Sequence, residues 1–442
     1  MQPVPPHPPE LDMRLTTSRP IRKPGPNRRQ RVPPALTRGT ERLEAISILD
    51  EIPGDLGLVL WRSARNVLLW AEAPAESRAA LFAGDAARVR RDELANADVD
   101  PELRGPVSVF ADLLRHPGQT DLLRLVNACR RVATWAEARG SLHTALEFAQ
   151  AAALAAPDSA SLAYGVGRVA RRLADYDRAE SWYTRAVVQG RDAHDWRSYA
   201  SGLAGMGNLH MQRGNYPAAK RVHQRCLHAA DRHRLADLRG AAYHNLFSIA
   251  IEMRAGPEAD VLAAHALAAY TPGDPGVLRL AIDVAYHWNL TGNFGGALQV
   301  ALALEPLVDD PPLRPSVQSL IARAAGGVGD RARYEAAVAR MDELLSDPAI
   351  PEEMVARALL GLAHGALNLG DRRAAALYAD EAISIARRRC EGRVVLEAEA
   401  VLDASTRPVM SSAPETGVAS PAPALADQLV QVLSRDVVAV AC

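Results

Sequence analysis

We consider the histidines first as candidate functional residues, because imidazole serves as a general base and as a zinc ligand. A metal site also needs thiolate or carboxylate ligands at suitable spacing, and only Cys226 lies close to the cluster. We therefore interpret these histidines as packing residues and expect neither a metal nor another cofactor. The clustered histidines are His210, His223, His228, His233, His244 and His265.

Arginines form a second cluster, at Arg168, Arg171 and Arg172. A guanidinium group binds both oxygens of a carboxylate or phosphate, so this cluster would suit an anionic ligand.

Catalytic motifs are missing from the sequence. It has no nucleophile elbow, dinucleotide fingerprint, HExxH or kinase signature. The glycine-rich fragment 324–329 lacks the Lys-Ser/Thr pair that a phosphate loop requires. We expect a protein that is not an enzyme.

The elements that must carry these residues are pairs of helices. In residues 201–231 two helical segments flank a turn at Gly214, a residue suited to the left-handed end of a helix. Gly207 should lie where the two helices approach closely, and we expect Gly207→Leu to overpack the contact while Gly207→Ala could stabilise the helix.

This pattern recurs along the chain. The small or aromatic residue that follows each turn recurs every 34 to 41 residues, which predicts seven helix pairs over residues 121–390. These positions are Ala145, Ala179, Ala219, Ala259, Ala297, Tyr334 and Ala375.

The repeat resembles the tetratricopeptide repeat (TPR), whose signature includes a helical Leu-Gly, a turn Gly-x-Tyr and two spaced alanines. The long spacing is similar to that of kinesin light chains and G-protein-modulator scaffolds. The resemblance implies an all-α, right-handed superhelical solenoid that acts as a protein-interaction scaffold or sensor.

In the TPR family, the first helices of successive pairs line a concave groove that binds peptides or helices. Asn208 and Asn245 stand where peptide-binding members often carry an amide, whereas the two lysines that grip a C-terminal carboxylate are missing. The groove residues implied by the resemblance are Arg130, Tyr164, Arg168, Arg171, Arg172, Asn208, Gln212, His244, Asn245, Ser248, Tyr286 and Asn289.

Residues 1–40 form a proline-rich arm with a local charge of +6, from eight Arg/Lys against Glu10 and Asp12. We expect it to be disordered, and Met13 is an alternative start. An alternative function is a regulatory protein that contacts nucleic acid through this arm. A net charge of −1 over 442 residues does not otherwise favour nucleic acid as a partner.

The remaining segments are assigned by composition and periodicity. We expect a helical cap or degenerate repeats over 41–120, a capping helix over 391–404 and a flexible linker over 405–424. Residues 425–442 should form an amphipathic helix that docks on its own C-terminal repeats or on a second copy, and competes with groove ligands.

Scattered cysteines without metal or CxxC spacing favour a reducing compartment, and we expect a cytoplasmic protein. No run of 18 apolar residues occurs, so we expect no membrane span.

Overall fold

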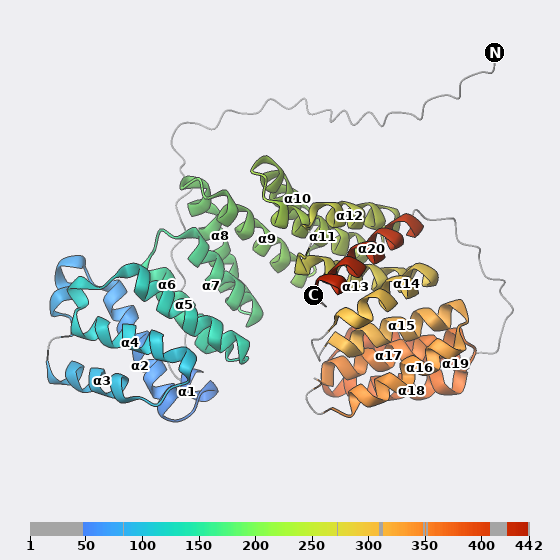
Figure 1. The fold of residues 1–442 in the computed structure, drawn as a ribbon, viewed down its shortest axis with the longest axis horizontal. Coiled ribbons are helices and arrows are strands. Elements are labelled where there is room, and N and C mark those ends of the chain that lie inside the picture. Colours follow the sequence, from blue (N-terminus) through green and yellow to red (C-terminus); the bar gives the residue numbers. More distant parts are fainter. Residues whose placement is uncertain are drawn as a thin grey trace, which may run out of the picture.

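The computed structural model describes residues 47–406, except 83, 272, 309–312, 348–349 and 351, and also residues 422–440. In these residues the regular structure is helical and contains no strand, and consecutive helices pack as pairs along a solenoid (Figure 1). The expected fold class, an all-α solenoid of helix pairs, is confirmed. The proposed arm at 1–40 and most of the linker at 405–424 lie outside the described residues.

Seven helix pairs follow one another between residues 122 and 388. They are α5 (Leu122–Ala138) with α6 (Leu142–Ala155), α7 (Ala160–Arg172) with α8 (Tyr176–Asp192), α9 (Trp196–Gln212) with α10 (Tyr216–Arg232), α11 (Ala236–Glu252) with α12 (Gly256–Ala269), α13 (Pro275–Thr291) with α14 (Phe294–Leu304), α15 (Arg314–Val328) with α16 (Arg331–Leu345), and α17 (Glu352–Asn368) with α18 (Arg372–Arg388). A 3-10 turn, η4 (Glu305–Leu307), follows α14.

Small residues near the start of each second helix let the paired helices approach closely. The six alanines at the repeat positions are 0% exposed, and Tyr334, at the seventh, is 6% exposed. The turns within pairs are sharp because one residue adopts a positive φ, as Gly214 does at 70°. Ala174 adopts φ 58° at the equivalent turn, where the sequence replaces glycine.

Gly207 lies at a close contact between α9 and α10. A Cβ atom added there would come within 2.4 Å of His223 Nε2, and the His223 ring is itself fully buried. The expected close approach is therefore present. The expectation that Gly207→Ala could stabilise the helix is wrong, because even a methyl group would collide with the imidazole ring.

The N-terminal helices are α1 (Ser47–Glu51), α2 (Asp55–Glu72), α3 (Asp85–Asn96) and α4 (Pro101–Arg115), with 3-10 turns η2 (Ala75–Ala80) and η3 (Pro117–Gln119). They attach to the first pair partly through Glu51. Its carboxylate accepts hydrogen bonds from the backbone N–H groups of His143 and Thr144, both at 2.8 Å. Glu51 therefore caps the free N–H groups at the start of α6.

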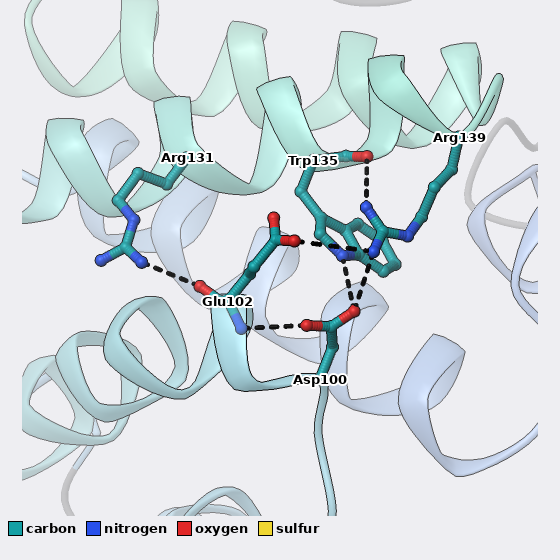
Figure 2. Close-up of polar contacts among 5 residues, drawn as sticks. All are labelled: Asp100, Glu102, Arg131, Trp135 and Arg139. Atoms are coloured by element: carbon teal, nitrogen blue, oxygen red, sulfur yellow. Dashed lines mark hydrogen bonds and ion pairs between the residues drawn. The ribbon is translucent and has the colours of Figure 1, made fainter.

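A second polar contact joins α4 to α5 (Figure 2). Asp100 caps α4 by accepting a hydrogen bond from the Glu102 backbone N–H, and its other oxygen accepts bonds from Trp135 Nε1 at 3.2 Å and Arg139 Nη2 at 2.9 Å. These contacts lower the pKa of the Asp100 carboxyl group, chiefly through the Glu102 backbone bond. The carboxylate thus remains ionised while it links two helices.

Helices α15 and α17 cross unusually closely. A Cβ atom on Gly326 would lie 2.2 Å from the Gly365 carbonyl oxygen, and one on Gly361 would lie 1.9 Å from Ser319 Oγ. Only glycine fits such crossings, because the neighbouring atoms include helix backbone that cannot move aside.

The chain ends in α19 (Gly392–Thr406) and α20 (Ala422–Val440). Helix α20 lies against α12, α13 and α14 of its own chain (Figure 1). Leu425, Leu429 and Leu433 are at most 5% exposed, and Gln299 Nε2 donates a hydrogen bond to Asp427 Oδ1 at 2.9 Å. The apolar stripe of α20, formed by these three leucines, is therefore covered by helices of the same chain.

Candidate functional site: an arginine-containing cavity lined by first helices

The first helices of the last pairs line a common cavity of about 580 Å³, which we call the inner cavity. Its walls come from α13, α15, α17 and the start of α19. Among the residues whose side chains the structure describes, helix α20 contributes none to this lining. The charged and phenolic residues of the lining are Asp283, Tyr286, Arg323, Arg357, Glu391, Arg393 and Glu397.

Each carboxylate of this lining is engaged by a neighbouring group through one oxygen, although Glu391 Oε2 is buried without a hydrogen-bond partner. His244 Nε2 lies 2.8 Å from Asp283 Oδ2. Arg389 donates to Glu391 and Arg393 donates to Glu397, at 2.7 and 3.0 Å respectively.

Two guanidinium groups of the lining have no such compensation. Arg323 and Arg357 form no hydrogen bond or ion pair through their guanidinium groups with the residues that the structure describes, and Arg323 Nε is buried. Burial lowers the pKa of Arg323, although Tyr286 and Glu397 act in the opposite direction. The guanidinium groups of Arg323 and Arg357 therefore keep hydrogen-bond donors that no carboxylate of the described residues accepts.

His364 lies beside Arg323 on α17. Burial, and after it the charge of Arg323, lowers the pKa of this imidazole to about 3. His364 is consequently neutral at physiological pH and adds no charge to the cavity.

Arg393 is one of the lining residues of the inner cavity. Its guanidinium donates to Glu252 Oε1 of α11 at 3.0 Å and to the Tyr286 hydroxyl of α13 at 3.4 Å, as well as to Glu397. The bonds to Glu397 and Glu252 raise the pKa of Arg393. The start of α19 is thereby tied to helices more than 100 residues earlier in the chain.

The predicted arginine cluster on α7 is in a different state. Arg168 makes a two-pronged bond to Glu137 of α5, at 2.8 and 2.5 Å, and Arg172 donates to the same carboxylate at 2.7 Å. Arg171 lies near the Tyr183 hydroxyl. Two of the three arginines are thus already occupied by a carboxylate of the same face.

The other predicted groove residues of the first pairs lie at or near the surface. Arg130 and Gln212 are exposed, whereas Asn208 and Asn245 are half-buried. Tyr164 is also half-buried and packs 5.9 Å from the Tyr183 ring, measured between centroids. Neither amide forms a side-chain hydrogen bond within the described part of the chain, so both can still pair with a ligand.

The remaining predicted residues separate into accessible and buried ones. Tyr286 lines the inner cavity, His244 bonds Asp283, and Ser248 Oγ donates to the His244 carbonyl oxygen at 3.1 Å. Asn289 is 1% exposed and donates to the Leu320 carbonyl oxygen at 3.1 Å. Its position between α13 and α15 takes it out of the candidate site.

The cavity residues Arg323, Arg357 and Arg393 were missed by sequence reasoning. A signal for Arg323 exists, because it lies six residues before the positive-φ residue Gly329. The predicted groove residues Asn208 and Tyr286 also lie six residues before a positive-φ glycine, Gly214 and Gly292 respectively. Applying the same offset to Gly329 would have added Arg323 to the predicted groove residues.

Two further kinds of site were sought in the described residues. Among them, no group of three or more His, Cys, Asp or Glu side chains is placed to hold a metal ion. No helix there combines the length and apolar character that crossing a bilayer demands.

No family model matches the chain, and no curated protein matches it. Solved structures are similar to it at low identity. A tetratricopeptide repeat protein from Parabacteroides merdae is 16% identical, with a TM-score of 0.42, over 64% of this chain and 99% of that one.

Two Rap proteins are also similar. The apo form of RapI is 12% identical, with a TM-score of 0.49, over 79% of this chain and 99% of that one. A Rap protein complexed with competence and sporulation factor is 11% identical, with a TM-score of 0.44, over 76% and 99%. The helix pairs and turns of the present chain fit a protein of the tetratricopeptide type.

Proposed function

We propose that this protein is a non-catalytic interaction scaffold whose inner cavity binds a segment of a partner protein through an acidic group. The observation that carries the proposal is the uncompensated pair Arg323 and Arg357. Arg357 is exposed, whereas the Nε atom of Arg323 is buried without a partner. Burying that part of the guanidinium group unpaired costs free energy, and a ligand carboxylate would recover that cost through charge-assisted hydrogen bonds.

We propose a peptide segment as the ligand because amide side chains on two other first helices are available to pair with its backbone. The cavity opens between four helices, and the half-buried amides Asn208 and Asn245 lie on the first helices α9 and α11. An amide side chain offers both a donor and an acceptor, so it can pair with the backbone of an extended segment.

The test begins with peptides selected from a random library against the full-length chain. Selected peptides should carry an acidic residue or a free C-terminal carboxylate. Isothermal titration should show at least a tenfold loss of affinity for Arg323→Met, on the order of one charge-assisted hydrogen bond. Methionine is a suitable replacement because it fills the space without a charge and should not destabilise the fold.

Arg331→Met is the matched control, because Arg331 is an exposed arginine on the second helix α16. It should leave peptide affinity within twofold of the parent. Asn208→Ala combined with Asn245→Ala should weaken only those peptides that are long enough to extend beyond the cavity. Equal affinity for the parent and Arg323→Met would refute the proposal.

A further inference from the structure

A second cavity, of about 810 Å³, lies outside the inner cavity, on the second helix α10. It is bounded by the end of α8 and the start of α9, and α10 lies at the outer edge of the molecule, far from α15–α19 (Figure 1). Neither a carboxylate nor a metal-binding group of three residues is found in this lining within the described residues. The function proposed for the inner cavity therefore does not account for this second cavity.

One face of α10 presents a row of basic side chains. Arg221, Arg225, His228 and Arg232 follow the spacing of three and four residues that places side chains on one helix face, and all four are exposed. The opposite face of α10 is buried, as His223 and Cys226 show. The row spans about 16 Å, from eleven residues at about 1.5 Å each.

The three arginines of this row are uncompensated. None of Arg221, Arg225 and Arg232 forms a hydrogen bond or an ion pair with another residue in the part of the chain that the structure describes. Elsewhere exposed arginines commonly have partners, for example Arg197 with Asp237 at 2.7 Å and Arg213 with Glu180 at 2.6 Å. Solvated like charges in a row repel one another, and a ligand with the opposite charge would relieve that repulsion.

The aromatic residue beside the row favours carboxylates over nucleobases as the ligand. Trp196 is stacked on His233 with ring centroids 4.3 Å apart, and it also contacts His194 and Tyr199. A single-stranded nucleic acid would need open aromatic faces for its bases, whereas the Trp196 ring is already packed by side chains of its own chain. The basic N-terminal arm is excluded as an occupant by its like charge.

We infer that this outer basic site, formed by α10 with the end of α8, binds an extended acidic segment of a partner protein. An extended chain advances about 3.3 Å per residue, so the row would span roughly five residues of the partner. Guanidinium groups at Arg221, Arg225 and Arg232 would each pair with a carboxylate of that segment. The inference does not depend on the proposed function of the inner cavity.

The test uses the full-length chain and a fluorescein-labelled octaglutamate peptide, followed by fluorescence anisotropy at two salt concentrations. The double variant Arg221→Gln/Arg225→Gln should weaken binding about three- to tenfold and reduce its salt dependence, as expected for two lost surface ion pairs. The control Arg331→Gln/Arg340→Gln removes the same charge from exposed positions on α16 and should change affinity less than twofold. The same comparison is repeated in the Arg323→Met background, which weakens any binding at the inner cavity, and the loss caused by Arg221→Gln/Arg225→Gln should be the same there.

Three outcomes would overturn the inference. The first is no measurable binding of octaglutamate by the parent chain. The second is an equal loss in the α16 control, which would show a response to net charge alone. The third is a labelled octathymidylate strand that binds more tightly than octaglutamate and is equally sensitive to Arg221→Gln/Arg225→Gln, which would assign the site to nucleic acid.

Discussion

Two arginine clusters on the first helices have opposite electrostatic states. On α7, Arg168 and Arg172 share the carboxylate of Glu137, whose side chain is 11% exposed. In the inner cavity, Arg323 and Arg357 lack such a partner among the described residues. The same residue type on the same face is thus structural in one region and available in the other.

The difference comes from one residue on the preceding helix. Glu137 of α5 lies where its two oxygens reach both arginines of α7. Around Arg323 the carboxylates are present but are held by His244, Arg389 and Arg393. Whether an arginine is free to bind a ligand therefore depends on which neighbouring groups hold the nearby carboxylates. The identity of the arginine alone does not reveal it.

The glycine crossing under the inner cavity gives the largest expected effect. Gly326→Ala places a methyl group 2.2 Å from the Gly365 carbonyl oxygen, and we expect a loss of about 3 kcal/mol in the free energy of unfolding. Gly165→Ala on α7 is the control, because no atom lies within 4 Å of its added Cβ. It should stabilise the protein by roughly 0.5–1 kcal/mol. Urea denaturation of both variants measures the contrast, and a Gly326→Ala protein as stable as the parent would contradict it.

A pH series next tests two buried histidines, His364 beside Arg323 and His223 on α10. Burial lowers the pKa of His364 to about 3 and that of His223 to about 4, against 6.5 for free imidazole. As the pH falls below 6.5, these histidines bind protons in the unfolded chain but not in the folded one, so the folded state loses stability. The loss ends when the pH reaches the folded-state pKa, because the folded protein then binds the protons as well. Between pH 7 and pH 5 each histidine should cost roughly 2 kcal/mol.

The two histidines can be separated by substitution. His364→Gln should make the decline of stability with pH shallower, because it removes the histidine that takes up a proton only in the unfolded chain. His223→Gln should remove its own share whether or not Arg323 is present. Parallel pH profiles for the parent and His364→Gln would show that His364 is not buried in its neutral form.

The smallest expected effect comes from converting the first cluster into the second. Glu137→Gln removes the charge that Arg168 and Arg172 share, and we expect a loss of about 1 kcal/mol, as for a partly exposed ion pair. The freed guanidinium groups should give the α7 face a new affinity for acidic peptides, measured by titration. Adding Arg323→Met to the Glu137→Gln variant should leave this new binding unchanged if the two regions act independently.

The order of the helix pairs could be predicted from sequence because it depends on local signals. A small residue after each turn and a residue that tolerates positive φ recur with the repeat, and both act within one pair. The position of α20 was harder to predict, because its apolar stripe fits several surfaces. It lies on α12–α14, and its described side chains do not line the inner cavity, so the predicted competition with groove ligands has no support in its described contacts.

The candidate site could be predicted only in part. Tyr286 lies in the cavity, but Asn289, three residues later, is buried against α15. The position of a residue within the repeat predicts which side of the helix it lies on. It does not predict whether the next helix buries that residue. Arg393 could not be found at all, since its contact with Glu252 joins residues 141 apart in sequence.

That contact has an evolutionary consequence. Open helical solenoids readily gain or lose repeats, because each unit touches only its neighbours. Here Arg393 of α19 must meet Glu252 of α11 across three intervening helix pairs. Duplication or deletion of one pair would carry the guanidinium group away from the carboxylate. The copy number between α11 and α19 should therefore be held constant by selection, while pairs before α11 are freer to multiply.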